Sequence, residues 1–106
     1  MMNQIILVGR LAKIEEIESE NGAKKGVITL AVPQSFKNID GIYDTNFIDC
    51  TLWGAIAENT IEYCTKGDVI GIKGRIQRLS NDKAMELIAE KVTFLSTTRK
   101  DEDGEE

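Results

Sequence analysis

The sequence has no histidine, a single proline and only two cysteines in its 106 residues. Without histidine it lacks the commonest general base near neutral pH, and the serine triad in its usual form is excluded. Cys50 and Cys64 have no histidine to complete a zinc site or a cysteine-histidine nucleophile, so we interpret both as small core residues. We therefore expect a protein that is not an enzyme and that carries no cofactor.

The sequence also lacks any run of 18 or more apolar residues, which is about the length that a membrane-spanning helix needs. Its first ten residues, MMNQIILVGR, have none of the basic start, long apolar stretch and small-residue cleavage site of a secretory signal. With 42% apolar and 29% charged residues, the composition is that of an ordinary globular protein. We expect one domain located in the cytosol.

Basic residues are outnumbered by acidic ones, 13 against 18, which gives a net charge of −5. Five of the acidic residues fall within the last six, DEDGEE, so residues 1–100 carry 13 residues of each sign. Residues 98–106 are predicted to be a short, acidic, disordered tail that either only solubilises the chain, competes with a negatively charged ligand for basic residues, or docks a partner weakly. The net charge does not exclude a nucleic-acid partner, because what matters is where the basic residues cluster.

Apolar residues recur at every second position in several segments, which is the pattern of half-buried strands. Residues 55–64 instead place Ala57, Ile61 and Cys64 on one side of a short helix. The predicted strands are residues 3–12, 27–34, 46–54, 68–79 and 84–95, with the helix after the third. This order within residues 1–97 predicts an all-β domain with one short helix, the five-stranded Greek-key barrel of the OB type; a split sheet covered by one helix is the alternative.

Between the strands, the sequence predicts two long connections. The charged residues 15–26 indicate a turn or solvated loop, and the polar residues 34–45 indicate a loop long enough to be functional. Pro33 should limit the preceding strand, because it has no N–H to donate. Residues 3–12 are apolar on both faces, so a second layer or another subunit must cover them. Residues 84–95 suggest a bulge or burial on both sides.

Residues 46–54, NFIDCTLWG, carry the first functional signal. Their core face holds Ile48, Cys50 and Leu52, so Phe47 and Trp53 stand on the outward face, where polar residues would be expected. Lys73 and Arg75 point outward from a later strand, and Phe36 and Lys37 lie in the loop before this one. Rings flanked by cations suit unpaired nucleic acid, whose bases stack and whose phosphates attract cations. The same features would also fit a dimer interface, packing under a loop, or a solvated face.

Five blocks of the sequence then narrow the choice. They are NQIILVGRLAK, ITLAV, NFIDCTLWG, AENTIEYCTKGD and IGIKGRIQ, in that order. In order and spacing, over roughly residues 2–95, they resemble the DNA-binding domain of bacterial and phage single-stranded DNA-binding proteins. The resemblance implies a non-catalytic OB-fold protein that binds single-stranded DNA with little sequence preference, as a homotetramer or a dimer. Replication or recombination proteins are the further partners that it implies.

The resemblance also implies roles for individual residues. Base stacking falls to Phe36, Phe47 and Trp53. Phosphate contacts fall to Arg10, Lys37, Lys66, Lys73, Arg75 and Arg78, with Lys13 and Lys83 as weaker candidates. Tyr63 is expected to pack the helix against the barrel rather than to touch DNA.

The sequence departs from the family pattern at three places. The hairpin near Asn81, RLSND, is too short for the aromatic residue that many members carry there, and Ala55 stands where some members have a cation. The tail is short and has no apolar end, which fits a phage, plasmid or mobile-element protein, or a shortened chain. An OB-fold protein-interaction module, of the primosome-accessory or recombination-mediator kind, and an RNA-binding protein stay open as alternatives.

Overall fold

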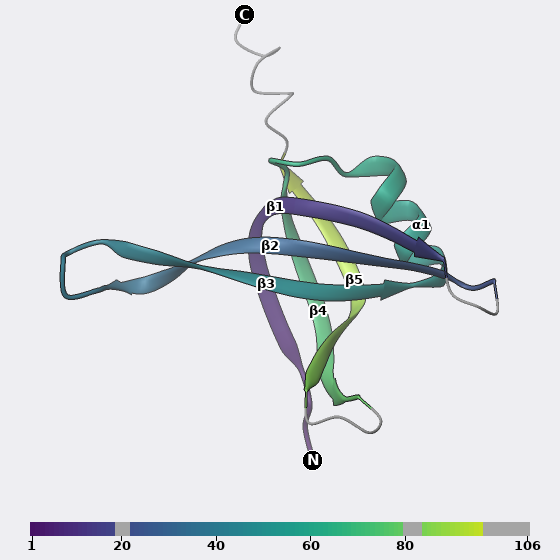
Figure 1. Ribbon diagram of the computed structural model, residues 1–106, viewed down its shortest axis with the longest axis horizontal. Helices are drawn as coiled ribbons and strands as arrows, with labels where there is room; N and C mark the ends of the chain where they lie inside the picture. The colour runs from purple at the N-terminus through teal and green to yellow at the C-terminus, as the bar shows by residue number, and fades with distance from the viewer. Residues whose placement is uncertain (19–21, 80–83, 97–106) are drawn as a thin grey trace, which may run out of the picture.

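The structure of the chain, a computed structural model, describes residues 1–18, 22–79 and 84–96 (Figure 1). Within them, five strands and one helix follow in the predicted order: β1 (Ile5–Glu18), β2 (Lys24–Lys37), β3 (Tyr43–Trp53), α1 (Gly54–Tyr63), β4 (Val69–Arg78) and β5 (Met85–Ser96). The strands close into a barrel in the order β1-β2-β3-β5-β4, and β4 pairs back to β1. The predicted five-stranded barrel is confirmed, and the split sheet is wrong.

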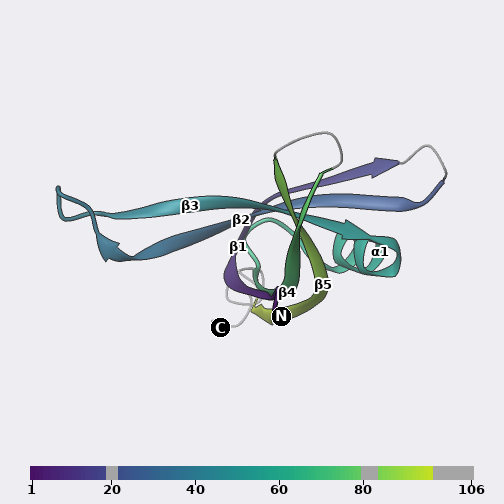
Figure 2. The ribbon, with the colours of Figure 1, turned by 90° about the horizontal axis from the view of Figure 1, so that it is seen from below.

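The period-two pattern of the strands fills the inside of this barrel. Residues 26, 28 and 30 of β2 and residues 70, 72 and 74 of β4 are buried, as are residues 50–52 near the end of β3. The helix α1 follows directly on β3 (Figures 1 and 2), and its Ala57 and Thr60 are buried. The buried cluster is Leu11, Ile28, Leu30, Cys50, Leu52, Ala57, Cys64, Ile70, Ile72 and Ala89. Both cysteines are free and buried, as predicted. Tyr63 was expected to pack the helix to the barrel, but its side chain is 66% exposed, so this prediction is wrong.

Both predicted loops turn out to be largely strand. β1 continues to Glu18 and β2 starts at Lys24, while β2 and β3 leave only residues 38–42 between them. The pairing passes Pro33, which lies opposite Thr45, and shifts register before Lys37 meets Tyr43. Residues 33–45 form an arm that projects from the barrel (Figures 1 and 2). Its strands look like loop in the sequence because two strands paired outside the core need no apolar face.

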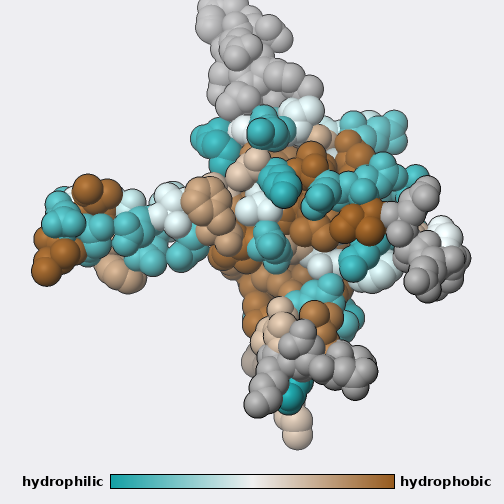
Figure 3. All heavy atoms as spheres, viewed as in Figure 1, coloured by the Kyte–Doolittle hydropathy of each residue, from teal (hydrophilic) through white to brown (hydrophobic). Residues whose placement is uncertain are grey.

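The turn at the end of the arm is held by Asn38. Its side-chain oxygen accepts hydrogen bonds from the backbone N–H groups of Asp40 and Ile42, at 2.9 and 3.0 Å, and its amide donates to Asp44. Gly41 has a φ of 78°, which favours glycine. Hydrophobic residues gather at the tip of the otherwise largely hydrophilic arm (Figure 3), where Ile39 is 98% exposed.

A bulge or burial on both sides was predicted for the last strand, and the structure shows a bulge. Lys73 pairs with Lys91, but Gly74 pairs with Ala89, so Glu90 is an extra residue in β5. Gly74 is needed at this point, because a Cβ there would overlap the backbone oxygen of Ile88. The bulge turns the side chain of Glu90 into reach of Arg75 on β4.

Candidate nucleic-acid interface

The outward face of β3 carries three exposed aromatic rings. Tyr43, Phe47 and Trp53 are 53%, 66% and 41% exposed, and all three occupy odd-numbered positions of the strand. The even-numbered Ile48, Cys50 and Leu52 turn into the barrel, as the alternation predicted. The sequence thus placed Phe47 and Trp53 correctly on the outside.

Basic residues flank these rings on the neighbouring strands. The register puts Arg10 of β1 opposite Ala31 of β2, which lies opposite Phe47. Two residues away from Ala31 on β2, Thr29 lies opposite Lys13 of β1 on one side and opposite Asp49 of β3 on the other. Neighbouring strands lie about 4.8 Å apart, so these cations stand roughly 10 Å from the β3 backbone. Lys13, a weaker candidate by sequence, therefore lies on the same face as the rings.

Two lysines lie directly over ring faces. The Lys25 Nζ is 5.2 Å from the centroid of the Trp53 ring, and the Lys37 Nζ is 5.8 Å from that of Tyr43. Such cation–π contacts at exposed sites contribute only about 0.5–1 kcal/mol. A base could therefore displace either ammonium group from its ring at small cost, and the lysine would remain beside the bound strand.

Sequence reasoning missed Tyr43 and Lys25. Both fell in segments predicted to be loops, where no facing can be assigned. The signal was nevertheless present, because Tyr43 continues the odd-numbered positions of Phe47 and Trp53. Phe36 and Lys37, predicted in a loop, are instead the last residues of β2 on the arm, and the Phe36 ring is exposed.

The remaining predicted cations that the structure describes lie on β4 or in the turn after α1. Lys73 is exposed on the outside of β4, beside Ile6 of β1 and Lys91 of β5. Arg78 is the last residue of the same strand. Lys66 lies in the turn after α1, which ends at Tyr63. The Arg10 guanidinium reaches this turn and donates a hydrogen bond to the backbone oxygen of Gly67 at 2.7 Å. Lys83 lies outside the described residues.

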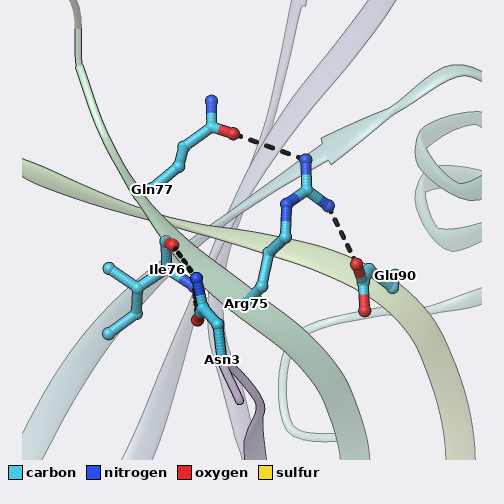
Figure 4. Close-up of polar contacts among 5 residues, drawn as sticks. All are labelled: Asn3, Arg75, Ile76, Gln77 and Glu90. Atoms are coloured by element: carbon cyan, nitrogen blue, oxygen red, sulfur yellow. Dashed lines mark hydrogen bonds and ion pairs between the residues drawn. The ribbon is translucent and has the colours of Figure 1, made fainter. Parts of the chain in front are cut away.

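Arg75 is already engaged by protein groups (Figure 4). Its guanidinium donates to Glu90 at 2.9 Å and to Gln77 at 3.4 Å, while Asn3 bonds the backbone of Ile76 on the same strand. Both side chains of the Arg75–Glu90 ion pair are more than 40% exposed. An exposed pair of this kind contributes about 0–1 kcal/mol, so a phosphate could compete for Arg75.

The outward face of β3 is interrupted where the barrel closes. Thr51 lies on the same side as Phe47, yet it is buried, because β3 pairs with β5 at Thr51 and Ile88. Its hydroxyl donates to Glu86 of β5 at 2.9 Å. Within the described ranges, no group of three or more His, Cys, Asp or Glu residues could hold a metal ion. In the same part of the chain, no helix is long and apolar enough to span a membrane.

A closed five-stranded barrel that bears rings and cations on its second and third strands has the architecture of the oligonucleotide-binding OB proteins. The model of the single-strand binding protein family matches residues 2–95, and the chain belongs to this family. The family assignment made from the five sequence blocks is thus confirmed.

Individual proteins of the family are similar over most of the chain. Single-stranded DNA-binding protein B of Bacillus subtilis is 42% identical, over 90% of this chain and 91% of its own length. The single-stranded DNA-binding protein of Bacillus cereus is 38% identical, and the match spans 61% of that longer protein. The crystal structure of wild-type single-stranded DNA binding protein from Thermus aquaticus matches with a TM-score of 0.74 at 24% identity. It covers 90% of this chain and 50% of that one, and it supports the fold alone.

Proposed function

We propose that the chain binds single-stranded DNA through the outward face of β2 and β3, and so protects it during replication, recombination and repair. The observation that carries this proposal is the row of exposed rings on β3, Tyr43, Phe47 and Trp53, with the cations Lys25 and Lys37 on β2 and Arg10 and Lys13 on β1. Membership of the family supports it, as do relatives named for single-stranded DNA binding. The family gives no catalytic residue to carry over, and we propose a binding role without enzymatic activity.

The spacing of the rings suggests how the strand is held. Tyr43 and Phe47 are four residues apart and Phe47 and Trp53 six, or about 13 and 20 Å at the usual strand rise. The rings are therefore separate points of contact along one bound strand. Each stacked base contributes about 1–3 kcal/mol, whatever its identity, and the flanking cations add a salt-dependent contribution.

Two measurements on purified protein test the proposal. If about five cations contact phosphate, log affinity for oligo-dT should fall with log salt at a slope near −3.5, from roughly −0.7 per contact. Trp53 emission should be quenched on binding, because the ring stacks on a base. An affinity for oligo-dT that does not change with salt would contradict the phosphate contacts. Unchanged Trp53 emission with tight binding would remove Trp53 from the site.

Binding experiments also distinguish the proposed function from a protein-interaction module and from an RNA-binding protein. A Phe47→Ala, Trp53→Ala double variant should lose most of its affinity for oligo-dT. If it binds DNA normally but loses a protein partner, the OB-fold interaction module is correct instead. Tighter binding to oligo-rU than to oligo-dU would favour an RNA ligand, because the two differ only in the 2′-hydroxyl.

We further propose that the chain works as a homotetramer, with a dimer as the alternative. The first half of β1 is apolar on both faces, and on the outward side Ile6 and Val8 are 68% and 53% exposed in the single chain. Together with Leu95 of β5 they line a shallow apolar hollow beside β4. We call Ile6, Val8 and Leu95 the apolar face. A second copy seated on it would remove these side chains from water. The cytosolic location and the acidic tail remain predictions.

A further inference from the structure

Asp49 is an acidic residue in the middle of the proposed DNA face. It is exposed on the outward side of β3, two residues from Phe47 and four from Trp53, and so about 7 and 13 Å from them along the strand. A carboxylate at this place repels phosphate. Its presence on a face otherwise suited to DNA calls for a group on the ligand that it can bind.

One oxygen of the Asp49 carboxylate is held by a hydrogen bond from the protein, and the other is available to a ligand. The Thr29 hydroxyl on β2 donates to Asp49 Oδ1 at 2.6 Å, and the register places the two residues directly opposite each other. Among the described residues, Oδ2 receives no hydrogen bond and no cation pairs with Asp49. Its orientation is therefore set by the protein, while one acceptor oxygen remains available to a ligand.

The charges around Asp49 indicate which part of the strand lies over it. Arg10 and Lys13 stand on β1, two strands away, whereas the rings stand on β3 itself. A bound strand places its phosphates near the cations and its bases over the rings. Asp49 shares the row of the rings, so base edges and not phosphates pass it.

A carboxylate accepts hydrogen bonds and donates none, so it distinguishes base edges by their donors. Cytosine presents its N4 amino group, and adenine and guanine also carry amino groups. Uracil and thymine present one N–H, placed between two carbonyl oxygens that repel a carboxylate. We propose that Asp49 reads the bound base and favours bases with an exocyclic amino group over thymine and uracil. This inference rests on the proposed function and adds a base preference to it.

The test compares oligo-dC with oligo-dU of about eight nucleotides, a length within the 4–16 that one OB fold covers. These bases carry the same ring and differ at the donor in question. The quantity measured is the ratio of dC to dU affinity in the wild-type protein, in Asp49→Asn and in Glu62→Gln. Glu62, exposed on α1, is the matched control for the loss of one negative charge. Backbone and stacking differences between the oligonucleotides cancel when the ratios are compared.

Asp49→Asn should lower the dC to dU ratio by about fivefold or more, the equivalent of roughly 1 kcal/mol for one base contact. An asparagine still accepts from Thr29, and its amide can donate to the uracil O4. Thr29→Val keeps the charge but releases the carboxylate, and it should lower the ratio to a smaller extent. Glu62→Gln should leave the ratio unchanged.

Each outcome decides between distinct claims. If the wild-type protein binds neither oligonucleotide, the proposed function itself fails. If it binds both and Asp49→Asn has the wild-type ratio, only the base reading by Asp49 is overturned. A Glu62→Gln ratio that falls as far as that of Asp49→Asn would also overturn it, because any lost charge would then suffice.

Discussion

Asp49 and Cys50 are neighbours on β3 whose side chains point to opposite sides of the barrel wall. Burial raises the pKa of the Cys50 thiol to about 11, and the nearby Asp49 carboxylate adds to the shift. Burial likewise raises the pKa of Cys64, with a smaller contribution from Asp68. In the folded chain both thiols hold their protons at pH values where an exposed thiol would lose them.

This shift predicts a loss of stability at alkaline pH. Because the folded pKa of Cys50 lies above the ordinary value of 9.0, its contribution is complete below about pH 9 and disappears as the pH rises through about 11. Urea unfolding at about pH 8 and pH 10.5 should show that the wild-type protein loses up to about 2 kcal/mol more than Cys50→Ala. The cavity in Cys50→Ala lowers the stability equally at both pH values, so its effect cancels when the losses between the two pH values are compared. Equal losses in the two proteins would contradict the buried, protonated thiol.

A substitution at Gly74 is also predicted to lower the free energy of unfolding. Gly74→Ala would place a Cβ against the Ile88 backbone oxygen and 3.2 Å from the Ala89 Cα, atoms that cannot move without breaking the β4–β5 pairing. We expect a loss of roughly 1–3 kcal/mol in the free energy of unfolding. Gly71→Ala is the control at the same protein concentration, because its Cβ would meet Leu95 at an ordinary 3.7 Å. Similar losses in both variants would indicate a general cost of alanine in β4.

At the scale of elements, the barrel strands could be predicted and the arm could not. Alternation is a local signal, and it appears wherever one side of a strand faces a core, as with Ile48, Cys50 and Leu52. In the arm neither side faces a core, so its strands are specified by cross-strand pairing, which a single strand's sequence does not reveal. For the candidate site, the outward facing of Phe47 and Trp53 was predicted, whereas Tyr43 of the arm and Lys25 at the start of β2 were missed because both fell in segments predicted to be loops.

The arm also predicts how binding depends on DNA length. Tyr43 lies about 13 Å beyond Phe47, so only a longer strand reaches it from the barrel. Tyr43→Ala should weaken binding of oligo-dT of about 16 nucleotides by about 1–3 kcal/mol, and change binding of about six nucleotides little. Tyr43→Phe keeps the ring and should bind as the wild-type protein does. Equal affinities of Tyr43→Ala and wild type for the long strand would remove the arm from the DNA path.

At the scale of the whole molecule, two of the exposed apolar regions among the described residues differ in their surroundings. The rings of β3 are interspersed with cations and Asp49, as suits a polar, charged ligand. On the apolar face, Ile6 and Val8 of β1 lie opposite Lys73 and Gly71 of β4, and Lys73 is the one charged residue among those that line the hollow. This contrast supports our proposals that DNA binds the first region and that a second copy of the chain binds the other.

The double variant Ile6→Glu, Val8→Glu tests this assignment. Both side chains point out of the barrel, so the substitutions should leave the fold intact while charge repels the second copy. Light scattering should show the mass falling from that of the oligomer to that of one chain. Affinity for a short oligonucleotide should persist, but affinity for a long one should fall by about 100-fold or more, because linked sites raise the effective concentration.

Ile39→Glu is the matched control, since Ile39 is equally apolar and almost fully exposed at the tip of the arm. It should leave the mass unchanged. A wild-type protein that is already a single chain would contradict the homotetramer, while an oligomer that survives both glutamates on β1 would place the contact elsewhere. Loss of the oligomer together with undiminished affinity for long DNA would show that one barrel alone holds the strand, and the linkage between DNA faces would then contribute nothing.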